Sequence, residues 1–269
     1  MASLYPLHIP QLTQPVLLEV HDHAADTHVS RFIVSDGVWE KYETELIISR
    51  LQDGDIFIDV GANIGYYSAL AAQLVGASGH VYGFEPEPLN YALFSGNAQR
   101  AGGDFCDNVT AVNAALAAKQ GEGFLFLNTA NRGDHQIYDD GKGRNKTAIA
   151  LVHGDSYFDA IDATMKARLI KVDTQGAEIE VLTGLNRLIQ RSLDKLTLVI
   201  EFWPRGLINC GGNAHQLLDW LLALDMPIYI IDQIEDRLIP ATEADLRPWI
   251  DDLNNTPSNE GFLNLLLER

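Results

Sequence analysis

The stretch DIFIDVGANIGYYS, residues 55–68, decides the fold that we expect for this chain. Its apolar start, residues 56–58, predicts a short strand that is buried on both faces of a sheet. Gly61 and Gly65 bracket a tight turn, and a helix of small residues follows from Tyr66 to Val75. A helix that begins here directs free N–H groups and the positive end of its dipole toward the tip of the strand. The stretch therefore predicts a binding site above that tip.

The residues around this corner indicate which ligand it holds. The middle glycine of a dinucleotide fingerprint is missing, and so is the lysine of a phosphate-binding loop. Asp59 at the strand tip would repel a pyrophosphate and favours a cation such as an ammonium group. Glu85 ends the next expected strand, twenty residues after Gly65, where an acid hydrogen-bonds ribose hydroxyls. S-adenosylmethionine, which has a ribose and an amino-acid end, fits both acids.

Three blocks of the sequence resemble the FkbM-type family of S-adenosylmethionine-dependent methyltransferases. They are DVGANIGYYS (59–68), FEPEPLNYALFSGN (84–97) and IKVDTQGAEIEVLTG (170–184). The resemblance runs from about Glu43 to the C-terminus. It implies methyl transfer to a hydroxyl of a sugar, glycolipid, polyketide or other small biosynthetic substrate. It also implies that the helix before the first strand covers the methionine end of the cofactor.

Strand and helix patterns alternate from residue 55 onward, which predicts a doubly wound, mostly parallel α/β sheet. The seven expected strands are 55–60, 80–85, 109–115, 169–173, 196–201, 227–232 and 261–267. The expected helices are 64–75, 88–101, 177–190 and 214–224, with a short helical connection at 155–167. The last strand follows a polar segment without a clear helix. Similarity to class I methyltransferases implies that this strand inserts antiparallel.

The N-terminal part, residues 1–52, is expected to extend the methyltransferase domain, residues 53–269, into one compact unit. We expect an irregular arm over residues 1–15 and a β-hairpin made by residues 16–20 and 29–34. A covering helix is expected over residues 39–51. Two further strands, 123–128 and 147–152, flank a polar loop, residues 128–146, that has no apolar period. A loop of that length is more often functional than idle, so we expect a lid over the pocket mouth; a surface insertion is the alternative.

Composition narrows the possible partners. The chain has 269 residues with 37 acids against 19 bases, a net charge of −18. Nucleic-acid binding depends on Lys and Arg, so this balance argues against it and against an anionic membrane surface. Cys106 and Cys210 form no C-x-x-C pair, which predicts reduced thiols and no metal site. With no secretory signal pattern and no membrane-length apolar run, we expect a cytoplasmic protein, and the oligomeric state stays open.

The candidate cofactor residues lie at the carboxyl ends of the expected strands, where open α/β sheets bind their ligands. Asn63 and Tyr66 are placed for the carboxylate of the cofactor, and Gly61 allows close backbone approach. Asn113 and Ala114 should border the adenine, although a strand-end turn explains Asn113 almost as well. The full set is Asp59, Gly61, Asn63, Gly65, Tyr66, Glu85, Asn113 and Ala114.

Four residues are candidates for the chemistry of the reaction. Lys171 and Asp173 are two apart on one strand and point to the same face, so an ion pair and a catalytic base are both open for Asp173. Glu201 ends the next strand and either assists or orients Lys171. His135 is a second candidate base because histidine titrates near neutrality, and a plain loop histidine is the alternative. N-methylation of a peptide or amide, and a non-catalytic binding partner, remain the other functional interpretations.

Overall fold

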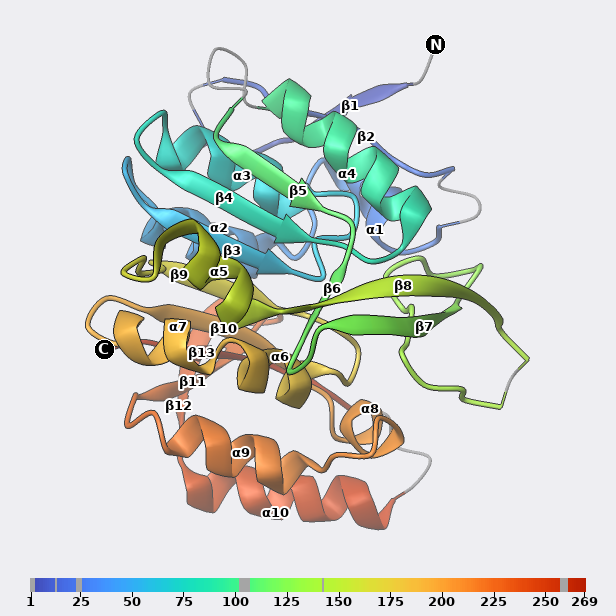
Figure 1. Ribbon diagram of the computed structural model, residues 1–269, viewed down its shortest axis with the longest axis vertical. Coiled ribbons are helices and arrows are strands. Elements are labelled where there is room, and N and C mark those ends of the chain that lie inside the picture. Colours follow the sequence, from blue (N-terminus) through green and yellow to red (C-terminus); the bar gives the residue numbers. More distant parts are fainter. Residues whose placement is uncertain (1–2, 13, 23–25, 102–106, 142, 257–260) are drawn as a thin grey trace.

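One central sheet with helices on both faces forms the body of the protein (Figure 1). The computed structural model describes residues 3–12, 14–22, 26–101, 107–141, 143–256 and 261–269. The described part of the sheet has eight strands, one more than expected. In spatial order they are β12 (Arg237–Ala241), β11 (Ile228–Asp232), β13 (Leu263–Leu267), β10 (Thr197–Phe202), β9 (Leu169–Val172), β3 (Ile56–Val60), β4 (His80–Phe84) and β5 (Val109–Val112).

The direction of the strands confirms the mostly parallel sheet. The five strands from β10 to β5 run parallel. The last strand, β13, inserts antiparallel between β10 and β11, as the similarity implied. All carboxyl ends of the five parallel strands therefore meet at one edge, and this edge carries most of the candidate site residues.

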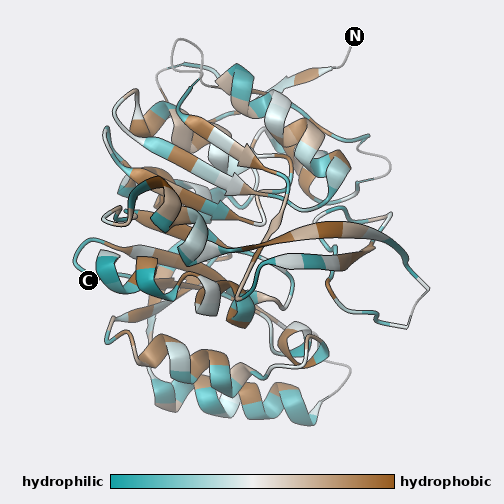
Figure 2. Ribbon diagram, viewed as in Figure 1, coloured by the Kyte–Doolittle hydropathy of each residue, from teal (hydrophilic) through white to brown (hydrophobic). Residues whose placement is uncertain are grey.

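Helices bury both faces of the central sheet. One face packs against α5 (Gly154–Asp162), α6 (Glu178–Gly184), α7 (Asn186–Ser192), α8 (Pro204–Asn209), α9 (Ala214–Leu222) and α10 (Glu243–Asn255). The other face packs against α1 (Val29–Asp36), α2 (Lys41–Arg50) and α3 (Tyr66–Val75), and α4 (Pro88–Ala101) packs on α3. The central strands are largely apolar, whereas the outer helices α9 and α10 are mixed (Figure 2). This pattern explains why the strands read as short apolar runs in the sequence.

A second, three-stranded sheet projects beside the carboxyl edge (Figure 1). It consists of β6 (Ala115–Ala117), β8 (Asn145–His153) and β7 (Gly121–Leu127), with β7 and β8 antiparallel. The strands expected at 123–128 and 147–152 are thus confirmed as the two arms of a hairpin. The polar loop between them, residues 128–144, is the tip of that hairpin.

The predicted N-terminal hairpin is wrong in one of its strands. Residues 29–34 belong to helix α1, and β1 (Leu4–Pro6) pairs antiparallel with β2 (Leu17–Glu19) instead. The carboxylate of Asp26, Oδ2, accepts the N–H of Ser30 at 2.9 Å and so satisfies a free donor at the helix start. Val29 and Ile33, four residues apart, bury one side of the helix. Tertiary packing here outweighs the β propensity of Val and Ile.

The C-terminal polar segment contains helix α10 and strand β12, neither of which was predicted. Thr242 and Asp245 form a capping box at the start of α10, and Leu246, Ile250 and Leu253 are buried. Pro248 inside the helix obscures this period in the sequence, since proline is unfavourable in helix interiors. β12 adds an antiparallel edge strand to β11 and raises the strand number to eight.

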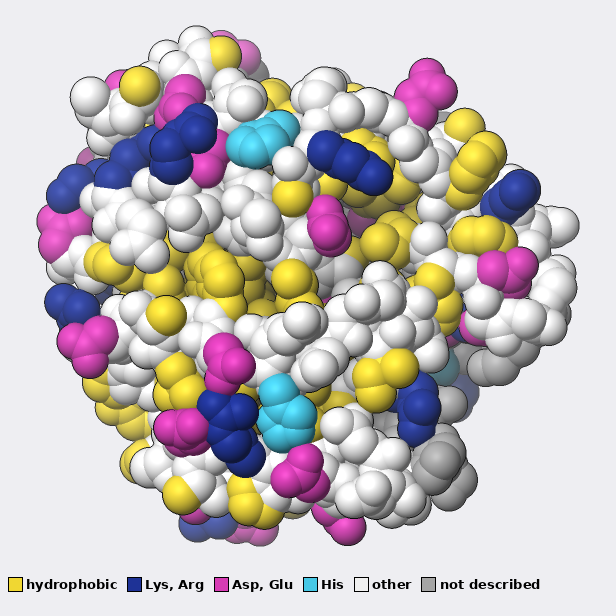
Figure 3. Space-filling model, turned by 60° about the horizontal axis from the view of Figure 1, so that its bottom comes forward, with side chains coloured by type: hydrophobic (Ala, Val, Ile, Leu, Met, Phe, Trp, Pro, Cys, Tyr) yellow, Lys and Arg dark blue, Asp and Glu magenta, His cyan; other side chains and the backbone are white. Residues whose placement is uncertain are grey.

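The surface carries mixed charges. On the face shown in Figure 3, Lys and Arg side chains are scattered among Asp and Glu. Within the residues that the structure describes, no helix is long and apolar enough to cross a membrane. Cys210 is a free, partly buried thiol, and Cys106 lies outside the described residues.

Candidate active site

A cavity of about 510 Å³ lies at the carboxyl ends of β3, β4, β9 and β10. Residues 131–138 of the hairpin loop line it together with these strand ends, which confirms the expected position of the loop. Eight of the twelve candidate residues line this cavity. They are Gly61, Asn63, Tyr66, Glu85, His135, Lys171, Asp173 and Glu201.

The glycine corner brings three elements together. Gly61 and Gly65 have φ angles of +83° and +81°, which only glycine adopts without strain. A Cβ on Gly61 would clash with the carbonyl oxygen of Asp173, and a Cβ on Gly65 would clash with the ring of Phe94. Gly61 therefore lets β3 approach the end of β9, and Gly65 lets α3 start against α4. Gly65 contributes to the corner through its packing against Phe94 and does not line the cavity.

Glu85 is buried at the end of β4, and its geometry fits a ribose. Its Oε1 accepts the N–H of Glu87 and its Oε2 accepts the N–H of Asn63, both at 2.8 Å. Each oxygen keeps a further lone pair that a hydroxyl can use. Burial raises the pKa of Glu85 to about 8, against the effect of the two N–H bonds.

Lys171 lies at the centre of a buried acidic cluster. Strand register places it beside Asp59, on the sheet face that α2 and α3 cover. Its Nζ lies 2.9 Å from Asp173 Oδ2, 3.9 Å from Glu43 Oε1 and 4.8 Å from the centre of the Tyr67 ring. The carboxyl groups around it raise the pKa of Lys171 above its usual value, against the effect of burial. Asp59 is buried beneath this layer and accepts the hydroxyl of Ser68, so it does not line the cavity.

The cluster has more acids than cations. Five carboxyl groups surround the single lysine: Glu40, Glu43, Asp59, Asp173 and Glu201. Burial, and then the charge of Glu40, raise the pKa of Glu43 to about 8. Burial likewise raises the pKa of Glu40 and Glu201. A second cation in the cavity would relieve this repulsion, and the sulfonium and ammonium groups of S-adenosylmethionine supply that charge. The residues present therefore fit the cofactor.

Asp173 is a member of the cluster whose side chain is open to the cavity. Its side chain is 32% exposed, against 5% for Lys171. Gln175 Nε2 donates to Asp173 Oδ1 at 3.1 Å and to Glu201 Oε2 at 3.0 Å, so the amide links the two carboxyl groups. The ion pair with Lys171 is thus present, and it orients a carboxylate that is open to the cavity.

A tight turn after β9 holds these residues in place. Glu178 Oε1 accepts the N–H groups of Thr174 and Gly176, both at 3.1 Å, and the hydroxyl of Thr174 at 3.0 Å. Gln175 adopts a φ of +55°, a left-handed conformation that is strained for a residue with a side chain. Glu178 therefore shapes the turn that presents Asp173 and Gln175.

The structure does not support His135 as a base. The N–H of Asn128 donates to His135 Nδ1 at 3.0 Å, so this nitrogen has no free lone pair. Burial, and next the charge of Arg132, lower the pKa of His135 to about 4. The ring is therefore neutral near pH 7, with its hydrogen on Nε2.

Asn113 and Ala114 do not border the cavity. The Nδ2 of Asn113 donates to the backbone oxygens of Glu85, at 2.9 Å, and Pro86, at 3.2 Å. This is the strand-end turn that was the alternative interpretation of Asn113. The apolar wall next to Glu85 comes from the next residues along, Ala115 and Leu116, and from Leu125 of β7.

Several lining residues were missed in the sequence. They are Trp39, Glu40, Gln175, Trp203 and Arg205. Gln175 and Trp203 lie two residues after Asp173 and Glu201, so the strand-end argument already pointed to them. Trp39 and Glu40 immediately precede α2, whose approach to the cavity depends on tertiary packing. Among the described residues, no group of three His, Cys, Asp or Glu side chains could hold a metal ion.

The fold and the cavity define the class of the protein. Doubly wound α/β proteins bind ligands beyond the carboxyl ends of their parallel strands, and this chain has its cavity there. A family model described as methyltransferase FkbM domain matches residues 59–225, which include the glycine corner, Glu85 and Asp173. The chain belongs to this family and is a methyltransferase that uses S-adenosylmethionine.

Individual relatives are distant. The chain is 26% identical over 189 residues to hexuronic acid methyltransferase AglP of Haloferax volcanii, covering 66% of this chain and 72% of that protein. The structure of Aeropyrum pernix fibrillarin with bound S-adenosylmethionine is 9% identical, with a TM-score of 0.44 over 84% of this chain and 74% of that one. Precorrin-6y C5,15-methyltransferase of Geobacter metallireducens is 11% identical, with a TM-score of 0.43 over 84% and 87%. At such TM-scores the assignment rests on the family match.

Proposed function

We propose that this methyltransferase acts on a hydroxyl group of a sugar or similarly polar acceptor, and that Asp173 accepts the hydroxyl proton. The single observation that carries the proposal is the carboxylate of Asp173, which is open to the cavity and fixed by Lys171 and Gln175. The curated relative with a hexuronic acid methyltransferase name supports a sugar acceptor. S-adenosylmethionine supplies an electrophilic methyl group when bound.

The residues of the chain have three tasks in this proposal. Glu85, the Gly61–Asn63 corner and the start of α3 bind the nucleoside of the cofactor. The acidic cluster attracts the cationic end of the cofactor. Asp173 orients the acceptor hydroxyl and takes its proton as the oxygen attacks. Glu201 holds Gln175, which in turn fixes Asp173. Alignment of the two reactants provides most of the remaining acceleration.

The hydroxyl of Tyr66 is engaged by residues next to and within α2. It accepts the N–H of Trp39 at 3.2 Å and lies 3.2 Å from the hydroxyl of Thr44. Tyr66 therefore positions the start of α2, where Trp39 and Glu40 line the cavity. We propose that Tyr66 contributes to the cofactor site through this contact and through its ring.

The test combines labelled transfer with one substitution. The protein is incubated with S-adenosylmethionine carrying a labelled methyl group and with UDP-glucuronic acid, UDP-glucose, glucuronic acid or a peptide mixture. Label should enter a sugar. Asp173→Asn should lower that turnover by roughly 10²–10⁴ while the affinity for S-adenosylhomocysteine stays the same.

A matched control uses an aspartate outside the site. Asp159 on α5 pairs with Arg187 and Arg191 and does not line the cavity, so Asp159→Asn should keep full turnover. Label in the peptide mixture alone would move the acceptor to nitrogen. Wild-type turnover by Asp173→Asn would reduce Asp173 to the partner of Lys171.

A further inference from the structure

The hairpin loop presents His135 to the cavity in a fixed position. Phe126 and Gln136 exchange two backbone hydrogen bonds, at 2.7 Å and 3.1 Å, which hold the chain next to His135. The carbonyl oxygen of Arg132 accepts the side-chain amides of Asn63, at 3.3 Å, and Asn90, at 3.1 Å. The loop is therefore anchored on both sides of His135.

The hydrogen-bond pattern fixes the tautomer of His135. A backbone N–H can only donate, so His135 Nδ1, which receives the N–H of Asn128 at 3.0 Å, carries a lone pair. A neutral imidazole then has its hydrogen on Nε2. This Nε2 is buried and has no hydrogen-bond partner in the described part of the chain. A buried donor without a partner is unfavourable, which indicates that a ligand supplies the acceptor.

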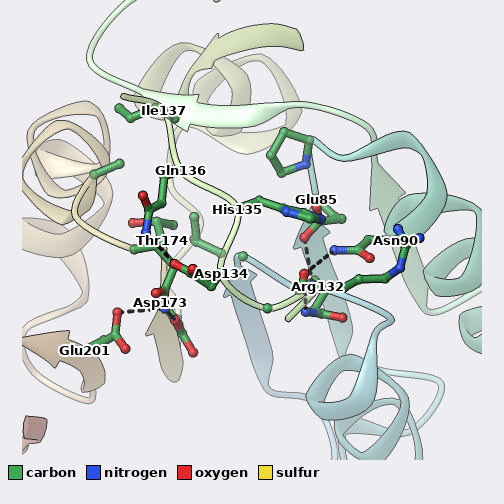
Figure 4. A pocket seen from close by; sticks show the side chains of 18 of the residues that line it. Glu85, Asn90, Arg132, Asp134, His135, Gln136, Ile137, Asp173, Thr174 and Glu201 are labelled. Carbon is green, nitrogen blue, oxygen red and sulfur yellow. Dashed lines mark hydrogen bonds between the residues drawn. The ribbon is translucent and has the colours of Figure 1, made fainter. Parts of the chain in front are cut away.

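The position of the loop indicates which part of the cofactor accepts a hydrogen bond from His135. Asn63, whose side chain holds the loop, donates its own N–H to Glu85. Figure 4 places His135 on the Glu85 side of the cavity, whereas Gln136 points to the side of Thr174 and Asp173. His135 therefore faces the nucleoside half of the cavity, and its neighbour faces the half where the acceptor binds.

The chemistry of Glu85 and His135 is complementary. The oxygens of Glu85, which already accept two backbone N–H groups, are placed to accept the hydrogens of ribose hydroxyls as well. The lone pairs of those hydroxyls then still lack a donor. The Nε2–H of His135 is such a donor. We infer that His135 binds the nucleoside half of S-adenosylmethionine by donating from Nε2, so that the hairpin loop is part of the cofactor site.

The inference uses the cofactor of the family and does not depend on the acceptor. Its test measures binding without turnover, by calorimetry with S-adenosylhomocysteine and with 5′-methylthioadenosine, which lacks the amino-acid end. His135→Phe keeps a flat ring and removes the donor, so both ligands should bind about tenfold more weakly. His135→Gln places an amide N–H near Nε2 and should restore most of the affinity.

Two readouts distinguish this role from a structural one. Without ligand, His135→Phe removes the unsatisfied Nε2 donor but also takes the acceptor from the N–H of Asn128, so these two effects on the melting temperature oppose each other. The informative quantity is the rise in melting temperature that S-adenosylhomocysteine causes, and this rise should be smaller in the variant than in the wild type. In ¹⁵N spectra of histidine-labelled protein, the Nε2 hydrogen of His135 should be present at pH 7 and shift when S-adenosylhomocysteine binds. Unchanged affinity of His135→Phe, or a loss confined to S-adenosylhomocysteine, would overturn the inference. These results stand whether or not a sugar proves to be the acceptor.

Discussion

At the scale of single residues, Gly65 shows how the sequence motif and the packing depend on one another. The residue has a positive φ, and the ring of Phe94 on α4 occupies the space that a Cβ on Gly65 would need. Gly65→Ala should lower the free energy of unfolding by roughly 1–3 kcal/mol, from backbone strain and overpacking together. Urea unfolding followed by tryptophan fluorescence measures this change.

Gly96 on the same helix as Phe94 provides the control. It lies in the interior of α4, and a Cβ there would meet only the flexible end of Arg100. Gly96→Ala should leave the protein equally stable or stabilise it by up to about 1 kcal/mol, since alanine favours helix. A Gly65→Ala protein as stable as wild type would show that α4 moves away easily and that the corner tolerates a side chain.

Site residues that lie at the carboxyl end of a strand can be predicted from the sequence. Residues whose position depends on contacts with a distant part of the sequence cannot. Glu85, Asp173 and Glu201 were placed correctly because the carboxyl ends of parallel strands meet at one edge. Asp59 also ends its strand, but its side chain points under α3 toward Ser68, which no local pattern reveals. Glu40 reaches the cavity only because α2 folds over the sheet. Its position depends on packing across a long sequence separation.

At the scale of elements, the helices that were predicted correctly are marked by local sequence signals, whereas those that were missed depend on tertiary contacts. The helix expected at 88–101 is found at Pro88–Ala101, because proline in its first turn marks where it begins. Helix α1 has only eight residues and contains Val, Phe and Ile, so its local propensity indicated a strand. Helix α10 has Pro248 in its interior. Tertiary contacts decide both elements, and these are absent from a local pattern.

The hairpin loop is held by Arg144, which predicts how the loop can be loosened. Its Nε donates to Asp140 at 2.8 Å, its Nη2 to the side chain of Asp134 at 2.9 Å, and its Nη1 to the Asp134 backbone oxygen at 2.6 Å. Hydrogen bonds to charged groups contribute about 1.5–3 kcal/mol each. In Arg144→Met, amides of residues 128–137 should exchange with deuterium at least about tenfold faster. S-adenosylhomocysteine should also bind more weakly, because His135 loses its fixed position.

Arg247→Met is the matched control for the loop. Arg247 on α10 also contacts two carboxylates, Asp219 and Glu243, but lies away from the cavity. It should leave exchange in residues 128–137 unchanged. Wild-type exchange in Arg144→Met would assign the order of the loop to the Phe126–Gln136 pair and to the bond between Asp26 and the N–H of Arg132.

At the scale of the whole molecule, the N-terminal segments share a core with the sheet. Leu18, Ile33 and Ile47 belong to the same buried cluster as Phe57 and Leu70. We propose that residues 1–52 and 53–269 fold as one unit, because neither side of this cluster would be covered alone. Helix α2 then couples stability to the site, since it carries Glu43 and its N-cap residue is Glu40.

Buried carboxyl groups, one in the acidic cluster and two outside it, make stability depend on pH in a defined direction. Burial raises the pKa of Glu43 and Glu85 to about 8 and that of Glu178 to about 7, from an ordinary value of 4.5. A carboxyl group with a raised pKa stabilises the folded state fully below its unfolded pKa, and this contribution is lost as the pH rises through the folded value. His135 has a lowered pKa, so its contribution to the stability of the folded state is lost as the pH falls. This loss begins only below about pH 6.5, the ordinary pKa of histidine. The acids therefore dominate between about pH 6.5 and 8.

Over that range the melting temperature of the ligand-free protein should fall as the pH rises, at constant ionic strength. S-adenosylmethionine should raise the melting temperature more at pH 8 than at pH 6.5, because its cationic groups lie beside carboxylates that are then ionised. Glu43→Gln keeps a hydrogen-bond acceptor for Asn264 and removes one of these charges, so its melting temperature should fall less with pH. Glu45→Gln, on the exposed side of the same helix, should retain the wild-type slope. A melting temperature that climbs steadily from pH 6.5 to 8 would mean that these carboxyl groups are already ionised in the folded protein, with Lys171 and ordered solvent compensating their charge.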